Sequence, residues 1–159
     1  MILLENMKNS INEVSFYRLN SLPIIKAAPK LIEKIYYSKQ RLLVVVENEE
    51  MLQNIDNVLW SYSTKHFIAH ATLNDPHPED QPVYLTSKKD DNANSSTIAM
   101  ALGMVNLDEV KAGKYCYMFD GNDEEQQKFA RSKWKQYKNQ DCKIIYWQQS
   151  DDGSWEKQG

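Results

Sequence analysis

Apolar and polar positions along the chain form blocks that predict strands and helices in turn. Residues 41–48, RLLVVVEN, contain a continuous apolar, largely β-branched run, as expected for a strand covered on both faces of a sheet. Before it, apolar side chains recur with helical spacing at Ala28, Leu31, Ile32, Ile35 and Tyr36. We expect this helix to begin near Pro29, because proline suits the first helical turn.

A second helical stripe follows that strand. Its apolar positions are Met51, Leu52, Ile55, Val58 and Leu59. Asn48 is the expected N-cap, and Glu49 and Glu50 stand in the first turn, where the helix dipole favours acids. The pattern therefore predicts a second helix directly after the buried strand.

The rest of the chain continues in the same manner. Runs with strand character occupy residues 12–19, 66–71, 82–87, 97–102, 114–120 and 143–149, and residues 123–138 predict a third helix. The polar segment 88–96 is expected to be a mobile loop. This alternation predicts a Rossmann-like three-layer α/β domain with a largely parallel twisted sheet. We expect a single domain over residues 13–159, after a flexible N-terminal extension of residues 1–12.

Composition resembles that of a soluble globular domain and limits the classes of function. Hydrophobic residues make up 42% of the 159 residues, and the net charge of -3 argues against a surface built to bind duplex DNA. No apolar run approaches the roughly 20 residues that cross a bilayer. The N-terminal MILL, followed by Glu5, does not resemble a secretory signal, so a cytoplasmic protein is expected. Cys116 and Cys142 lack CxxC spacing and are expected to be reduced core residues.

The sequence lacks the motifs of nucleotide binding and of common catalytic sites. No glycine-rich phosphate loop stands in either of the first two strand-to-helix turns, so no nucleotide cofactor is expected. Neither G-x-S-x-G nor H-E-x-x-H occurs. A metal would have to use His66, His70 and His77, with Asp75 or Glu79. Residues four apart on a strand stand roughly 13 Å from each other, too far to bind one ion together, so no metal site is expected.

One short stretch, FARSKWKQYK at residues 129–138, combines bases and aromatic residues without any acid. Bases at the end of a helix complement its dipole, and the aromatic residues could belong to the core, so a structural explanation is open. The alternative is a small pocket in which Arg131 holds a carboxylate, Lys135 adds charge and Trp134 walls in an apolar side chain. Such a pocket suits a peptide that ends in acidic and aromatic groups.

Four segments carry a recognisable pattern in a fixed order. They are V-S-F-Y-x-L, R-L-L-V-V-V-E-N-E-E followed by I-D-N-V-L-W, H-F-I-A-H, and F-A-R-S-K-W-K-Q-Y-K. Together, from about Val14 to Trp147, they resemble the chi subunit of bacterial DNA polymerase III, an accessory protein of the clamp loader. The resemblance implies a non-catalytic adaptor. One surface would grip the acidic C-terminal tail of the single-stranded DNA-binding protein, and another would dock the psi subunit, which ties chi to the clamp loader.

The resemblance also implies residues for the tail-binding site. The family's pocket arginine falls on Arg131, its aromatic neighbour on Trp134 and its lysine on Lys135. A further lysine of the family falls on Gln127 with Lys128 beside it, so either Lys128 substitutes for it or the pocket is weaker. The family's tyrosine becomes Trp134, which keeps an aromatic wall but loses the hydroxyl.

A second set of residues is implied for the psi-side surface. Trp60, at the end of the second helical stripe, and Phe67, in HFIAH, match family positions there. Aromatic residues favour cores and interfaces alike, so burial in the core is the alternative for both.

Two other functions stay open on the sequence. One is a small Rossmann-like enzyme acting on an anionic metabolite, with Arg131 and Lys135 as its anion clamp, which would need a deep pocket. The other is a direct single-strand binder that stacks bases on Trp134 and Tyr137. The acidic pI of about 5.6 disfavours the second. An adaptor is expected to have a shallow groove and no high-affinity nucleic-acid site.

Overall fold

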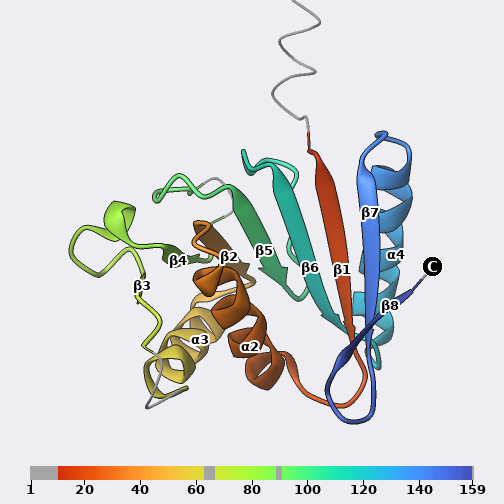
Figure 1. The fold of residues 1–159 in the computed structure, drawn as a ribbon, viewed down its shortest axis with the longest axis horizontal. Helices are drawn as coiled ribbons and strands as arrows, with labels where there is room; N and C mark the ends of the chain where they lie inside the picture. Colours follow the sequence, from red (N-terminus) through yellow and green to blue (C-terminus); the bar gives the residue numbers. More distant parts are fainter. Residues whose placement is uncertain (1–10, 63–66, 89–90, 159) are drawn as a thin grey trace, which may run out of the picture.

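The computed structural model describes residues 11–62, 67–88 and 91–158, and its strands form one mostly parallel sheet (Figure 1). The strands are β1 Glu13–Leu19, β2 Leu42–Val46, β3 His70–Ala71, β4 Val83–Thr86, β5 Ile98–Leu102, β6 Lys114–Asp120, β7 Lys143–Gln149 and β8 Trp155–Gln158. The helices are α2 Ile24–Tyr37, α3 Glu49–Ser61, α4 Glu124–Lys138 and the short 3-10 turn η1 Pro78–Asp80. The strand order is β3-β4-β2-β5-β6-β1-β7-β8, and of the pairs formed by described residues only β7–β8 is antiparallel. The expected α/β class with a largely parallel sheet is confirmed.

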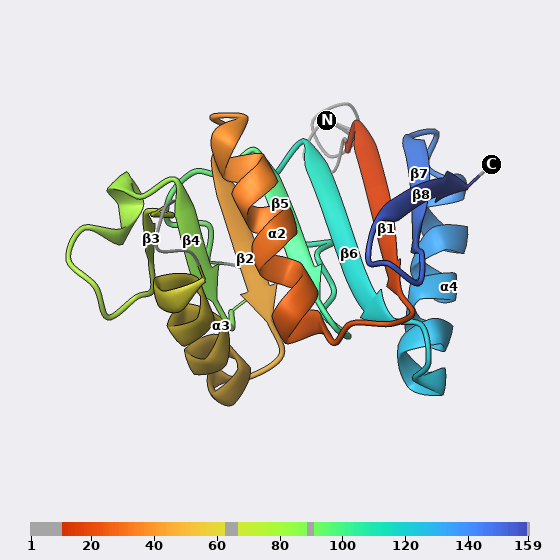
Figure 2. The ribbon, with the colours of Figure 1, turned by 60° about the horizontal axis from the view of Figure 1, so that its bottom comes forward.

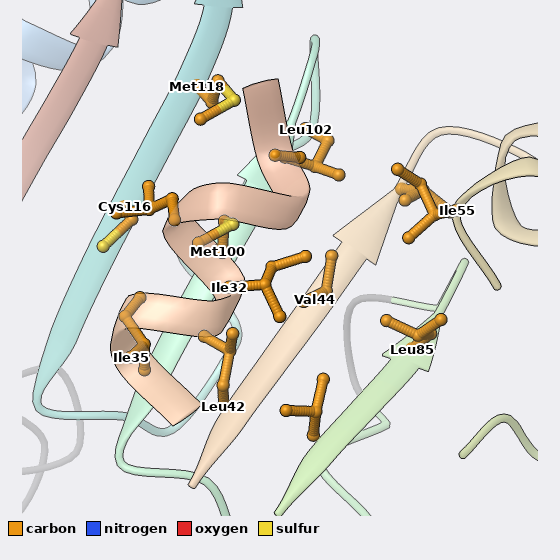
Figure 3. Close-up of a cluster of buried hydrophobic side chains, with 14 of the residues drawn as sticks. Ile32, Ile35, Leu42, Val44, Ile55, Leu85, Met100, Leu102, Cys116 and Met118 are labelled. Atoms are coloured by element: carbon orange, nitrogen blue, oxygen red, sulfur yellow. The ribbon is translucent and has the colours of Figure 1, made fainter. Parts of the chain in front are cut away.

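Helices cover the sheet from both sides. α2 and α3 lie on one face, and α4 lies on the other behind β7 (Figures 1 and 2). Between α2 and the sheet, Ile32 and Ile35 are packed in one buried cluster with Val44, Met100 and Cys116 (Figure 3). Full burial of one such aliphatic side chain contributes roughly 1.5–3 kcal/mol, so this face supplies much of the folding energy.

The opposite face has a more aromatic core. Phe16 of β1 stacks on Tyr117 of β6 with ring centroids 5.6 Å apart, and Tyr137 of α4 packs on Tyr117 at 5.9 Å. The segment between β5 and β6 covers a further part of this face, since Val105 and Leu107 are buried in the same cluster. α4 is therefore fixed on the sheet by its aromatic side.

The first helix begins earlier than the sequence pattern indicates. α2 starts at Ile24, and the amides of Lys26 and Ala27 both donate to the Pro23 carbonyl at 3.0 Å. Pro29 therefore lies inside the helix, buried, where it lacks the N–H that would donate one turn back. The expected start near Pro29 was wrong because Pro23 already provides the extended residue before the first turn.

Other boundaries follow the sequence more closely. The α3 cap is confirmed, since Asn48 Oδ1 accepts from Met51 N at 2.9 Å. The strand expected over residues 66–71 is shorter, because β3 consists of His70–Ala71 alone. Strand β8 was not expected, although the D-D-G-S turn before it, with Gly153 at φ 89°, is a hairpin signal.

Within the polar segment 88–96, which was expected to be a mobile loop, Asn94 is held in place by hydrogen bonds. The Asn94 side chain is fully buried and donates to the Gln81 carbonyl at 3.0 Å. Arg41 Nη1 donates to the Asn94 carbonyl at 2.9 Å. Polar residues therefore hold this segment against the sheet through hydrogen bonds, which hydropathy alone does not reveal.

The two cysteines are free and differ in burial. Cys116 is buried in the core, where desolvation raises the pKa of its thiol to about 12. Cys142 is only partly buried, so the expectation of a core residue holds for Cys116 alone. Of the expected N-terminal extension, residues 1–10 lie outside the described residues, and the Asn12 amide donates to the Gly113 carbonyl at 2.9 Å. Within the described ranges, none of the helices is both long and apolar enough to span a bilayer.

Candidate functional site

Helix α4 carries the stretch that the sequence singled out, and its ends explain its stability. Asp123 caps the N-terminus, because its Oδ1 accepts from Glu125 N at 2.9 Å and Gln126 N at 3.1 Å. Acidic residues occupy the first turn and Lys135 and Lys138 the last turn, as the helix dipole favours. The charge gradient along α4 thus has a local structural cause.

A groove of about 540 Å³ runs between one face of α4 and the sheet. The helix contributes Gln127, Ala130, Arg131, Trp134 and Lys138. The strands contribute Arg18 from β1, Phe119 from β6, Ile144 and Tyr146 from β7, and Gln158 from β8. An apolar floor with cations at its edge is therefore assembled from segments far apart in the sequence.

The cations of this groove have few acidic neighbours. Arg131 is exposed, and over the described ranges neither Arg131 nor Arg18 forms an ion pair. Lys138 Nζ lies 4.7 Å from the centre of the Trp134 ring, a cation–π contact. The groove thus joins an aromatic wall to positive charge that is free for an anionic ligand.

Three of the five residues expected in this site line the groove: Gln127, Arg131 and Trp134. Lys128 and Lys135 are exposed on α4 but do not line it. At about 100° per residue, both lysines lie on the side of Arg131 away from Trp134. They are therefore near the groove edge, where their charge acts through solvent.

The groove residues contributed by the strands were not expected from the sequence. Alternation along KIIYWQQ places Ile144 and Tyr146 on one face of β7, a signal that was present in the sequence. Arg18 interrupts the apolar stripe of Val14 and Phe16 on β1, which also could have been noticed. Only the strand order brings β1 and β7 next to α4.

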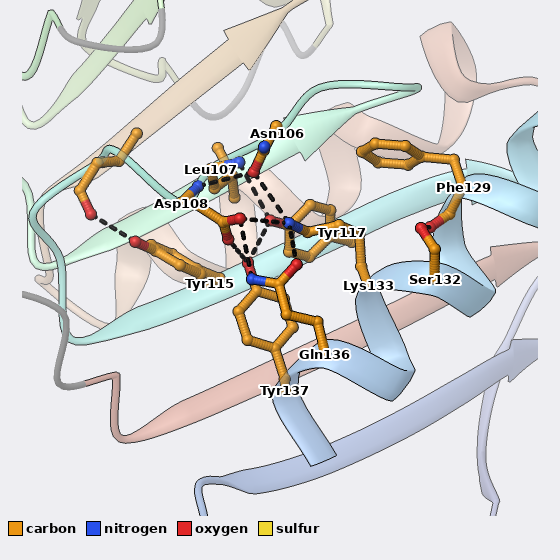
Figure 4. Close-up of polar contacts among 11 residues, drawn as sticks. Asn106, Leu107, Asp108, Tyr115, Tyr117, Phe129, Ser132, Lys133, Gln136 and Tyr137 are labelled. Atoms are coloured by element: carbon orange, nitrogen blue, oxygen red, sulfur yellow. Dashed lines mark hydrogen bonds and ion pairs between the residues drawn. The ribbon is translucent and has the colours of Figure 1, made fainter. Parts of the chain in front are cut away.

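The other side of α4 uses its polar residues in a different way (Figure 4). Lys133 belongs to the basic stretch 129–138, but it is buried and donates to Asp108 Oδ2 at 2.7 Å. It also donates to Asn106 Oδ1 at 3.0 Å and Gln136 Oε1 at 2.8 Å. All three ammonium hydrogens are thereby satisfied, and Lys133 takes no part in the groove.

Tyr137 belongs to the same buried network. Its hydroxyl donates to Asp108 Oδ1 at 2.5 Å and is 2.7 Å from the Tyr117 hydroxyl, which in turn accepts from Leu107 N at 3.1 Å. Burial raises the pKa of Tyr137. Because this ring is buried, Tyr137 is not a stacking platform for bases, and that alternative is wrong in this part.

The pKa of Asp108 depends on two opposing effects, burial and the hydrogen bonds of the network. Burial alone would raise it, but hydrogen bonds from Lys133, Tyr137 and Gln136, together with the Lys133 charge, lower it below its usual value. The carboxylate therefore stays ionised and anchors the segment after β5 to α4.

Trp60 and Phe67 lie on the surface of the molecule near β3. Their side chains are 54% and 62% exposed, so the alternative of core burial is wrong for both. The two ring centroids are 5.6 Å apart, and Trp60 also lies 4.7 Å from His70. His70 is held by Asp56 at 3.0 Å and by the Ile68 carbonyl at 2.8 Å. Trp60 and Phe67 thus form a small exposed aromatic surface that packs on the hydrogen-bonded His70.

The structure does not bring together the histidines that were considered for metal binding. His66 lies outside the described residues, and His70 is engaged with Asp56. His77 Nδ1 lies 3.5 Å from Glu79 Oε1. His77, Glu79 and Asp80 are all exposed, and one potential ligand atom from each lies within 4.8 Å of the other two. Exposed acidic groups of this kind are ordinary on protein surfaces, so this cluster is not assigned a function.

The crevice where doubly wound sheets bind nucleotides has the wrong charge for phosphate. At the carboxyl ends of β2, β4 and β5 it is lined by Glu47, Ser87 and Met104, among others. Glu47 Oε1 accepts from Met104 N at 2.8 Å. A carboxylate held at this point repels a phosphate group.

Comparison with known proteins gives the family. The model of the family described as "DNA polymerase III chi subunit, HolC" matches residues 11–145, which include most of the groove but not Tyr146 or β8. The "Probable DNA polymerase III subunit chi" of Rickettsia prowazekii (strain Madrid E) is 31% identical over 98 residues. That similarity covers 62% of this chain and 59% of the Rickettsia protein. On the extent of the family match, this chain belongs to the DNA polymerase III chi subunit family.

Proposed function

We propose that this accessory subunit of DNA polymerase III is a non-catalytic adaptor in DNA replication. It would bind the acidic C-terminal tail of the single-stranded DNA-binding protein and, through the psi subunit or an equivalent protein, link it to the clamp loader. The role would place the protein at the replication fork in the bacterial cytoplasm.

One observation carries the proposal: the groove beside α4 combines an apolar and aromatic lining with two guanidinium groups that form no ion pair with any described residue. An acidic peptide ending in an aromatic residue complements both features, because carboxylates pair with arginine and the ring fills the apolar part. The net charge of -3 disfavours tight binding to nucleic acid itself. The protein would thus approach coated single strands without competing for phosphates.

The first test is a titration with a fluorescent peptide that carries the last ten or so residues of the same organism's single-stranded DNA-binding protein. We expect affinity on the order of micromolar, about -8 kcal/mol. Arg131→Ala should lose most of this affinity, because it removes a guanidinium that would pair with a carboxylate of the peptide. The variant should still fold, because the exposed guanidinium forms no ion pair within the described ranges. A peptide without its terminal phenylalanine should also bind poorly.

The matched control is Lys30→Ala, which removes an exposed positive charge from α2 on the opposite face. It should bind the peptide as the unmodified protein does. Full tail affinity in Arg131→Ala would overturn the assignment of the groove.

The exposed Trp60 and Phe67 surface is proposed as the site for psi or an equivalent clamp-loader protein. Calorimetric titration with that partner should give weaker binding for Trp60→Ala and Phe67→Ala, since exposed aromatic residues commonly dominate interface energies. Met104→Ala, which truncates an exposed apolar side chain elsewhere, serves as the control. Equal affinity in all three variants would remove this surface from the proposal.

A further inference from the structure

Arg18 occupies a position that the strand pattern reserves for an apolar side chain. Val14 and Phe16 of β1 face α4 in the buried aromatic cluster, and Arg18 continues the same alternation. Its register partner on β6 is Phe119, and both residues line the groove. A partly buried arginine thus stands at the apolar floor of the site, at the carboxyl end of a central strand.

The hydrogen bonds of Arg18 leave most of its charge uncompensated. Nη2 donates to the Gly121 carbonyl at 3.2 Å, and Nε is buried without a hydrogen-bond partner among the described residues. No carboxylate lies within ion-pair distance among the residues that the structure describes. A guanidinium has five N–H donors, and a cation in partly apolar surroundings is costly unless it is paired. Binding of an anion next to Arg18 would therefore offset the cost of holding its charge in these surroundings.

Gly121 and Gln127 determine where the Arg18 side chain lies. A Cβ at position 121 would approach Arg18 Nε to 2.6 Å, so glycine there leaves room for the arginine. Gln127 Nε2 donates to the same Gly121 carbonyl, which places the neutral Gln127 side by side with Arg18. A side chain fixed in advance loses less conformational entropy when a ligand binds.

We propose that Arg18 is a second carboxylate-binding residue of the groove. It supplies positive charge at the end where α4 presents the neutral Gln127, while Arg131 supplies it one turn further along the helix. Lys128 does not fill this role, because it is exposed and does not line the groove. The inference rests on the proposed binding of an acidic peptide. The carboxylate it takes is either the terminal one or an acidic side chain of that peptide.

The experiment compares Arg18→Gln with the unmodified protein for three tail peptides: the native one, one with an amidated C-terminus, and one with its aspartates replaced by asparagine. Arg18→Gln should bind the native peptide roughly tenfold more weakly, the scale of one hydrogen-bonded charge. Lys30→Gln, which removes an exposed charge from α2 on the opposite face of the sheet, is the control and should bind as the unmodified protein does. Adding Gln127→Lys to Arg18→Gln should restore affinity by returning a cation to the same end of the groove.

The peptides identify the carboxylate. The effect of Arg18→Gln should disappear for the amidated peptide if Arg18 binds the terminal group, and for the asparagine peptide if it binds a side chain. Thermal unfolding checks every variant. If Arg18→Gln does not fold, Arg18→Lys carries the comparison, because it keeps the charge but loses the guanidinium fork, and intermediate affinity is expected.

Three results would overturn the inference. If the unmodified protein binds the native tail and Arg18→Gln binds it equally well, Arg18 has no role and the proposed function stands. If Arg18→Gln weakens all three peptides alike, Arg18 shapes the groove and binds no carboxylate. If the unmodified protein binds no tail peptide, the proposed function fails and this inference fails with it.

Discussion

Basic residues on the two faces of α4 differ in burial and in pairing. Lys133 is buried and its ammonium group is fully paired with Asp108, Asn106 and Gln136. Arg131, two residues earlier, is exposed at the groove and has no ion pair within the described ranges. One helix therefore carries a cation that stabilises the fold and a cation that remains available to a ligand.

A basic stretch in a sequence can therefore contain charges with two different roles. The electrostatic energy of a partnered charge contributes to folding, and its removal leaves a partner unsatisfied. A charge without a partner contributes little to folding, and its removal is felt when an anion binds. Substitutions on the two faces of α4 should therefore change different measured quantities.

Lys133→Met should cause the largest change, a loss of about 2–3 kcal/mol in the free energy of unfolding, because it leaves Asp108 without its cation. The value is below that of a fully buried pair, since the Asp108 side chain is 34% exposed. Urea unfolding at neutral pH measures it. Lys128→Met, an exposed lysine of the same helix, should be nearly as stable as the unmodified protein.

Peptide affinity should also distinguish the two faces of α4. Folded Lys133→Met should bind the tail peptide normally, because Lys133 does not line the groove. A variant that is fully stable but deficient in binding would show that the two faces are not separate.

Trp134→Ala should weaken tail binding by about 1.4 kcal/mol, roughly tenfold, because the groove loses its aromatic wall and the Lys138 contact. Trp134→Tyr keeps a ring and should retain most of the affinity. For a peptide without its terminal aromatic residue, the difference between these variants should shrink. Fluorescence anisotropy with both peptides measures these affinities. If the two variants differ as much for the shortened peptide as for the native one, the Trp134 ring does not contact the terminal ring of the peptide.

Stability should fall in acid through Asp108. Its pKa is lowered in the folded protein, so the contribution of the ionised carboxylate is fully present above the unfolded pKa and is lost as pH falls through the folded pKa. Urea unfolding from neutral pH to below about pH 4 should give a steeper loss for the unmodified protein than for Asp108→Asn. Parallel curves for the two proteins would exclude Asp108 as a source of the acid sensitivity.

Lys135→Ala and Lys128→Ala should have the smallest effects, each under about 1 kcal/mol in peptide affinity, because these exposed lysines act through solvent. Their effects should vanish as salt rises, since exposed charges are screened over roughly 10 Å at 0.1 M. Titrations at two salt concentrations measure this. An effect of Lys135→Ala as large as that of Arg131→Ala would place Lys135 inside the site.

The local pattern of the chain was enough for most of the fold. Continuous apolar strands and capped helices are encoded within a few residues, so β6 and β7 match their expected ranges and Asn48 caps α3 as expected. The start of α2 and the hairpin that ends in β8 were missed. Both depend on turn residues, Pro23 and Gly153, whose effect lies in backbone angles and not in hydropathy.

Local sequence is sufficient to predict the helix that bears Arg131 and Trp134, because helical spacing places both on neighbouring positions of α4. Which of its bases are paired depends instead on how the chain packs in three dimensions. Strand order brings Arg18, Phe119 and Tyr146 to the groove, and the segment after β5 brings Asp108 to Lys133. Whether a charge is paired depends on contacts between residues distant in sequence, and these contacts exist only once the sheet has formed.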